Sequence, residues 1–182
     1  DVEALLELMV DLGAAVEWTG DHSLRIDPSG VRSTAPNARL VAQIRASVLL
    51  AGPLLARFGS VTLPPPGGDV IGRRRLDTHL LAFEQLGAEV TIGTEFKLVA
   101  PHLEGADIFL DEPSVTGTEN ALMAAVRARG RTILRNAASE PHVQDLANGL
   151  VTMGARIDGI GTNMLTIEGV DRLRGGRLAI GP

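Results

Sequence analysis

The chain of 182 residues carries a net charge of -5, is 45% hydrophobic and contains no cysteine. That length suffices for one sizeable domain with its own core, and the negative charge argues against general nucleic-acid binding. The lack of cysteine excludes disulfides, thiolate metal sites and a cysteine nucleophile, and no apolar run approaches the length of a membrane span. We therefore expect a cytoplasmic protein that binds neither nucleic acid nor membrane.

Three segments share one pattern, in which an amphipathic helix ends at a glycine and two short strands follow. They cover residues 5–16, 80–90 and 146–157. Glycine adopts the left-handed conformation at a helix C-terminus without steric cost, so a helix end is predicted at each glycine. The alternating sequence after each glycine predicts a pair of strands. The second strands of these pairs are 23–26, 96–99 and 164–167.

Two further helices are predicted between these segments, from about residue 38 to 57 and from about 118 to 129. Their central stretches are apolar on most faces, which is typical of buried helices. A short strand follows each of them, at 60–63 and at 132–135. The order helix, strand, helix, strand, strand therefore recurs along the chain.

This order gives two complete units, preceded by the second half of another. Either one more buried helix and its strand precede Asp1 in a longer protein, which we favour, or the first unit is degenerate. Such units would pack with their buried helices at the centre and their sheets outside. Residues 1–182 are thus predicted to form a single α/β domain, an inside-out α/β barrel with pseudo-threefold symmetry.

The segment from residue 63 to 79 is the least ordinary part of the chain. Three prolines and two glycines precede Asp69, and three arginines, Arg73, Arg74 and Arg75, follow it. Guanidinium groups bind phosphates and carboxylates through paired hydrogen bonds, so one interpretation is a lid over an anionic substrate. The other is a surface hairpin loop with solvated charges, and composition alone slightly favours the latter.

Two other positions are candidates for anion binding. Arg45 lies among apolar residues and needs a partner, for which a substrate anion and an internal carboxylate are equally good. Thr116 and Glu119 have the spacing of a capping box at a helix start, where free N–H groups can hold an anion. The histidines and acidic residues show no metal-ligand spacing, and no nucleotide-binding glycine motif is present, so neither metal nor cofactor is predicted.

Residues 67–79 resemble the loop of the UDP-N-acetylglucosamine enolpyruvyl transferases, whose common form is P-G-G-C-x-I-G-x-R-P-V-D-x-H. Further stretches similar to that family are 44–59, 114–125, 136–141 and 165–170. The resemblance implies enolpyruvyl transfer from phosphoenolpyruvate to UDP-N-acetylglucosamine, the first committed step of peptidoglycan synthesis, without a cofactor. It also implies two domains of three α/β units each, with the active site between them. Without its second domain, this chain alone is expected to be inactive.

Asp69 occupies the position of the family's cysteine, the acid that protonates C3 of the enolpyruvyl group. The neighbouring arginines favour the ionised carboxylate, so we expect bound phosphoenolpyruvate and a closed lid to restore the proton. A carboxylate is a poorer nucleophile than a thiolate toward the epoxide of fosfomycin. The resemblance therefore implies insensitivity to that antibiotic.

The resemblance implies substrate-binding roles for ten further positions. They are Arg45, Arg74, Arg75, Leu76, Asp77, Thr78, Glu112, Pro113, Ser114 and Val115. The stretch that begins at Glu112 matches the one that holds the uridine diphosphate end of the substrate. Two departures stand out: Arg75 replaces the family's usual Pro, and Thr116-Gly117 replaces its usual Gly-Ala.

Two other functions remain open. One is the shikimate-pathway enolpyruvyl transferase, although the long G-G-D-x-I-G stretch is not its signature. The other is a catalytically silent UDP-sugar-binding module of the same fold, for which the departures at Arg75 and Thr116 leave room. His79 also follows the family's pattern, and the sequence alone equally allows it to be an ordinary residue at a helix start.

Overall fold

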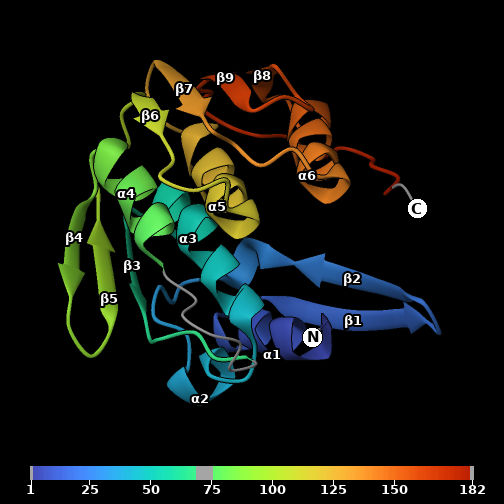
Figure 1. Cartoon of the computed structure of the whole chain (residues 1–182). Helices are drawn as coiled ribbons and strands as arrows, with labels where there is room; N and C mark the ends of the chain where they lie inside the picture. The colour runs from blue at the N-terminus through green and yellow to red at the C-terminus, as the bar shows by residue number, and fades with distance from the viewer. Residues whose placement is uncertain (1, 69–75, 181–182) are drawn as a thin grey trace.

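The computed structural model of the protein describes residues 2–68 and 76–180. The predicted helix and hairpin occur three times in it (Figure 1). The helices are α1 (Val2–Asp11), α4 (Asp77–Gln85) and α6 (Pro141–Thr152). The hairpins that follow them are β1 (Ala15–Gly20) with β2 (Ser23–Asp27), β4 (Glu89–Ile92) with β5 (Phe96–Val99), and β8 (Arg156–Asp158) with β9 (Met164–Glu168). All three predicted segments are confirmed.

Each helix passes into its hairpin at the predicted glycine. Gly13, Gly87 and Gly154 have φ angles of 105°, 90° and 101°. In each case the glycine N–H bonds to the carbonyl three residues earlier, and the following alanine N–H bonds to the carbonyl five residues earlier. These two bonds define a Schellman motif, in which a Cβ would strain the residue of positive φ. The same hairpin start after each glycine shows that the three segments are one structural repeat.

Two buried helices, α3 (Ala51–Phe58) and α5 (Val115–Ala125), lie against each other at the centre of the molecule, with the sheets around them (Figure 1). They approach so closely that a Cβ on Gly52 would lie 2.6 Å from the carbonyl oxygen of Asn120. A strand follows each helix as predicted: β3 (Ser60–Leu63) and β7 (Arg131–Arg135). No helix in the described ranges is long and apolar enough to cross a membrane.

The predicted helix from 38 to 57 is wrong as one continuous element. It is broken into α2 (Ala38–Val41), a 3-10 helix η2 (Arg45–Leu50) and α3. Ile44 is extended, with φ -136° and ψ 144°, and interrupts the helix before η2. Pro53 has no N–H to donate and is tolerated in the first turn of a helix, which is where α3 places it. The apolar pattern correctly predicted burial but could not locate these breaks.

The second buried helix begins and ends earlier than predicted, at Val115 and Ala125. Its N-cap is Ser114, whose hydroxyl accepts a hydrogen bond from the Gly117 N–H at 3.1 Å. The predicted capping box of Thr116 and Glu119 is therefore wrong, because both residues already lie inside the helix. Serine at an N-cap is as favourable as asparagine or aspartate. The spacing of Thr116 and Glu119 alone therefore could not locate the start of this helix.

The strand after each buried helix joins the second strand of the next hairpin. β3 pairs antiparallel with β5 in the sheet β3-β5-β4, and β7 pairs antiparallel with β9 in the sheet β6-β7-β9-β8. In the described ranges, no strand pairs with the corresponding edge of β2. The sequence did not predict β6 (Asp107–Phe109), which pairs parallel with β7, because three residues are too few to show an alternating pattern.

Two buried threonines differ in how their hydroxyls are satisfied. Thr132 is 1% exposed, and its Oγ1 has no hydrogen-bond partner in the part of the chain that the structure describes. Thr118 is fully buried, and its Oγ1 donates to the Ser114 carbonyl at 2.8 Å and accepts from the Ala138 N–H at 2.9 Å. An unpaired buried hydroxyl costs free energy, whereas a paired one contributes.

We expect Thr132→Val to raise the free energy of unfolding by about 1 kcal/mol, because it removes an unpaired hydroxyl at nearly constant shape. Thr118→Val is the matched control and is expected to lower it by about 2 kcal/mol, since the Ala138 N–H loses its acceptor. Urea unfolding of the two variants and the parent measures both effects. Equal destabilisation by the two substitutions would contradict this account.

Candidate active site

Three chain segments that carry predicted site residues converge at one end of the buried helices. They are the start of η2 with Arg45, the start of α4 with Leu76, Asp77 and Thr78, and the start of α5 with Ser114 and Val115. α5 contacts both η2 and α4. Residues that are widely separated in sequence therefore share one end of the core.

The described end of the loop before Asp69 packs against the segment that carries Arg45. The Gly67 N–H bonds to the Val41 carbonyl at 3.1 Å. Gly68 has φ 92°, and a Cβ on it would lie 3.0 Å from the backbone nitrogen of Arg45. Gly68 is thus held next to Arg45, and Gly67 next to Val41. Asp69, Arg73, Arg74 and Arg75 themselves lie outside the described residues.

A cluster of polar side chains that is buried except at Thr116, here called the polar junction, links the three segments. It consists of His79, Thr116 and Asn120, together with the backbone of Val48 and Gly52. Asn120 Oδ1 accepts from the Gly52 N–H at 2.9 Å, and Asn120 Nδ2 lies 2.9 Å from both the Val48 carbonyl oxygen and His79 Nδ1. His79 Nε2 lies 3.2 Å from Thr116 Oγ1. Every polar atom of the Asn120 side chain is thereby bonded, as burial requires.

His79 is 3% exposed and is the third residue of α4. Burial first, and then the positive charge of Arg45, lower the pKa of His79 from 6.5 to about 4. Both causes disfavour the imidazolium, which is the charged form. The ring is consequently neutral near pH 7. The effect of Arg45 on the pKa of His79 shows that the guanidinium lies close enough to the polar junction to act on it electrostatically.

The low pKa of His79 predicts a stability that depends on pH. The unfolded chain takes up this proton near pH 6.5, but the folded chain resists it until about pH 4. The contribution is therefore complete above pH 6.5 and is lost as the pH falls toward 4, by about 3 kcal/mol in all. Urea unfolding between pH 7 and pH 4.5 should show this loss in the parent and in His22→Gln, and a shallower loss in His79→Gln. If the free energy of unfolding fell equally steeply with pH in all three proteins, His79 would not be the source of the loss.

Contacts between the starts of α4 and α5 explain part of the Thr116-Gly117 departure. A Cβ on Gly117 would lie 3.1 Å from Thr78 Cγ2 and 3.0 Å from Ser114 Cβ, so glycine leaves room for the threonine. Thr78 Oγ1 in turn donates to Asp111 Oδ1 at 2.6 Å. Thr78 is 2% exposed, so its side chain fastens α4 to the segment before α5 and does not face solvent.

The other predicted substrate-binding positions differ in accessibility. Asp77, Glu112 and Pro113 are exposed, Ser114 and Val115 are partly exposed, and Leu76 is buried at 9% exposure. Arg45 is partly exposed and makes an interaction within the protein. The side chains at the exposed positions are therefore accessible to a ligand, whereas the side chain of Leu76 is not. In residues 2–68 and 76–180, no three His, Asp or Glu side chains gather as a metal site.

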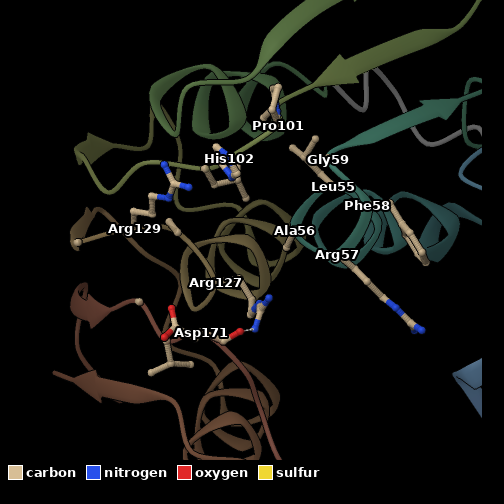
Figure 2. Close-up of a pocket in the computed structure, with 16 residues that line it drawn as sticks. Leu55, Ala56, Arg57, Phe58, Gly59, Pro101, His102, Arg127, Arg129 and Asp171 are labelled. Atoms are coloured by element: carbon tan, nitrogen blue, oxygen red, sulfur yellow. Dashed lines mark hydrogen bonds between the residues drawn. The ribbon is translucent and has the colours of Figure 1, made fainter.

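A cavity of about 560 Å³ lies at the other end of the buried helices, where α3 and α5 finish (Figure 2). Arg57, Arg127 and Arg129 line it, but their guanidinium groups point in different directions (Figure 2). Arg127 donates to the carbonyl oxygen of Asp171, and Arg57 donates to that of Pro28. The Arg129 guanidinium lies 3.6 Å from the Glu104 carboxylate. These cations bond within the protein and do not converge on a common point. The cavity is therefore a weaker candidate than the end of the buried helices that carries the polar junction.

Comparison with known proteins identifies the family. The profile of the EPSP synthase family (3-phosphoshikimate 1-carboxyvinyltransferase) matches residues 1–182. The chain belongs to this family. Among curated members, a UDP-N-acetylglucosamine 1-carboxyvinyltransferase of Bradyrhizobium diazoefficiens is 64% identical over 93% of this chain and 39% of its own length. A protein of the same name from Treponema denticola is 53% identical over 100% of this chain and 43% of its own. The chain thus spans well under half of these members of the family.

Solved structures of the family share the fold. The enolpyruvyl transferase NikO from Streptomyces tendae superimposes with a TM-score of 0.76 at 24% identity, covering 92% of this chain and 40% of that one. EPSP synthase from Acinetobacter baumannii gives a TM-score of 0.70 at 20% identity, covering 95% and 40%. The predicted enolpyruvyl transferase fold of α/β units is therefore confirmed.

Asn120 organises the site and was not predicted from the sequence. Asn120 lies where α5 changes from the polar residues Thr118 and Glu119 to the apolar run that begins at Ala121, and it is fully buried. A polar amide inside a buried helix requires partners, and that requirement was the available signal. Its partners could not be named from sequence, because they lie 41 to 72 residues away.

Proposed function

We propose that this chain is one domain of a UDP-N-acetylglucosamine 1-carboxyvinyltransferase that acts in the cytoplasm. The observation that carries the proposal is 64% identity over 93% of the chain to a protein of that name. The reaction would join the 3-hydroxyl oxygen of UDP-N-acetylglucosamine to C2 of phosphoenolpyruvate and release inorganic phosphate. The product is the first committed intermediate of peptidoglycan synthesis.

The proposed roles follow the resemblance. They are supported by the way the starts of η2, α4 and α5 converge around the polar junction. Asp69 would deliver the proton to C3 of the enolpyruvyl group. Arg74 and Arg45 would bind the anionic substrates, and Arg45 adjoins Gly68 at the described end of the loop. The remaining contacts with UDP-N-acetylglucosamine would come from Arg75, Leu76, Asp77, Thr78, Glu112, Pro113, Ser114 and Val115. Since the side chains of Leu76 and Thr78 are buried, these two residues would contribute through their backbone.

A second domain of the same protein would complete the site. The curated relatives are more than twice as long as their matched portion, and the resemblance places the catalytic base and part of the phosphate-binding residues outside this chain. The single-domain chain would therefore be inactive, although it retains the polar junction and the start of α5.

Phosphate release by the full-length protein tests the proposal. With phosphoenolpyruvate present, UDP-N-acetylglucosamine should support turnover and shikimate 3-phosphate should not. Turnover with shikimate 3-phosphate would assign the shikimate-pathway reaction instead. Calorimetric binding of UDP-N-acetylglucosamine without any turnover would identify a silent binding module. Product formation by residues 1–182 alone would overturn the two-domain account.

A further inference from the structure

The hydrogen-bond direction in the polar junction can be deduced atom by atom. The Gly52 N–H can only donate, so the Asn120 side-chain atom that it meets at 2.9 Å must be the oxygen. The other atom of the amide is then Nδ2, which can only donate. It donates one hydrogen to the Val48 carbonyl oxygen and has the second available for His79 Nδ1 at 2.9 Å.

The orientation of Asn120 fixes the tautomer of His79. Nδ1 accepts from Asn120 and therefore carries no hydrogen, so the single proton of the neutral ring resides on Nε2. Nε2 lies 3.2 Å from Thr116 Oγ1 and donates to it. A continuous donor series thus runs from the Gly52 N–H through Asn120 and His79 to the Thr116 hydroxyl.

The Thr116 hydroxyl has one hydrogen left to donate. Its oxygen already accepts from His79, so this hydrogen must point elsewhere. No acceptor for it lies within residues 2–68 or 76–180 among the hydrogen bonds that the structure shows. Unlike His79 and Asn120, which are 3% and 0% exposed, Thr116 is partly exposed. The series therefore begins in the core and ends on a donor that solvent or a ligand can reach.

We propose that Thr116 Oγ1 donates a hydrogen bond to a phosphate oxygen of the nucleotide-sugar substrate, and that His79 and Asn120 are the positioning residues that orient it. The inference rests on the proposed function, in which the adjacent Ser114 and Val115 bind this substrate. Thr116 directly follows these two residues in the first turn of α5. The side chain that replaces the family's usual glycine is then a specificity-determining residue of this chain.

The Thr116 hydroxyl accepts from the buried His79, which Asn120 holds in turn. A hydroxyl oriented in this way makes a stronger contact than a freely rotating one, because part of its orientational entropy is already lost in the free protein. The phosphate oxygen is charged, and hydrogen bonds to charged groups are stronger than neutral ones. The expected effect falls on nucleotide-sugar affinity, since the proposed contact is with that substrate alone.

Steady-state kinetics of the full-length protein test this inference. Thr116→Val removes the hydroxyl at nearly constant shape and is expected to raise the KM for UDP-N-acetylglucosamine about 10-fold, with little change in kcat or in the KM for phosphoenolpyruvate. Thr116→Ser keeps the hydroxyl and should restore the parental KM. Thr19→Val, on the exposed β1, is the matched control. A parental KM in Thr116→Val, or a change confined to phosphoenolpyruvate, would overturn the proposal.

A double-mutant cycle tests the positioning role. His79→Ala is expected to raise the same KM, and adding Thr116→Val to it should raise it little further, since both changes remove one oriented contact. Additive effects would show that His79 acts independently of Thr116. If His79→Ala does not fold, Thr116→Val and Thr116→Ser still test whether the Thr116 hydroxyl binds the nucleotide sugar. Calorimetric binding of UDP-N-acetylglucosamine separates this inference from the proposed reaction, because it reports on Thr116 even if the parent shows no turnover.

Discussion

Asp69→Asn in the full-length protein is expected to lower the turnover number by roughly 10²–10⁴-fold, the usual contribution of a general acid. An amide has nearly the shape of a carboxylic acid but has no acidic proton to give to C3 of the enolpyruvyl group. Nucleotide-sugar affinity should change little, since the predicted contacts with that substrate come from other residues. Phosphate release at saturating substrate, with calorimetric binding alongside, separates the two effects.

Asp69→Cys is the matched control, because cysteine is the family's usual residue at this position. This variant is expected to retain turnover and to become susceptible to inactivation by fosfomycin, whereas the parent should resist it. A thiolate attacks the epoxide more readily than a carboxylate does. Near-normal turnover in Asp69→Asn would refute the proposed role of Asp69, whatever the behaviour of the cysteine variant.

Asn120→Leu is expected to lower the free energy of unfolding by about 5 kcal/mol. The substitution leaves three buried groups without their partners: the Gly52 N–H, the Val48 carbonyl and His79 Nδ1. Each unpaired buried group costs about 1–3 kcal/mol, and leucine fills the volume that water would need to replace the amide. A loss of this size is comparable to the whole stability of many domains, so a largely unfolded variant is the expected outcome.

Asn148→Leu is the control for the same change on an exposed position of α6. It should leave stability within about 0.5 kcal/mol of the parent, as is usual for surface substitutions. Urea unfolding followed by circular dichroism measures both variants. A small effect of Asn120→Leu would show that the polar junction contributes little to the association of α3 with α5.

The elements that sequence predicted best are those with strong local signals. The helix ends at Gly13, Gly87 and Gly154 were predictable because one residue type suits positive φ and the flanking periodicity changes from helix to strand. The interrupted helix before α3 was not, because apolar residues at 38–57 satisfy a continuous helix and a broken one equally. β6 was missed because its pairing with β7 is a long-range contact of a very short strand.

The candidate site was predictable as a set of positions but not as a hydrogen-bond network. A resemblance along the whole chain named Arg45 and the stretches that begin at Leu76 and Glu112, and α5 brings these segments to one end of the core. The resemblance could not reveal that Thr78 is buried, or that His79 connects Thr116 to Asn120. Those relations depend on packing between helices, which a single sequence does not encode locally.

The Gly52 N–H offers a single-residue probe of how the core opens. Most amides in helices bond to a carbonyl of their own helix and exchange their hydrogen when one turn frays, but this one bonds to a side chain 68 residues away on α5. Its hydrogen can exchange with solvent only when α3 and α5 separate. The exchange rate at Gly52 should therefore report the opening of the whole domain. The amides of the β1–β2 hairpin, which projects from the core (Figure 1), should exchange through local motions.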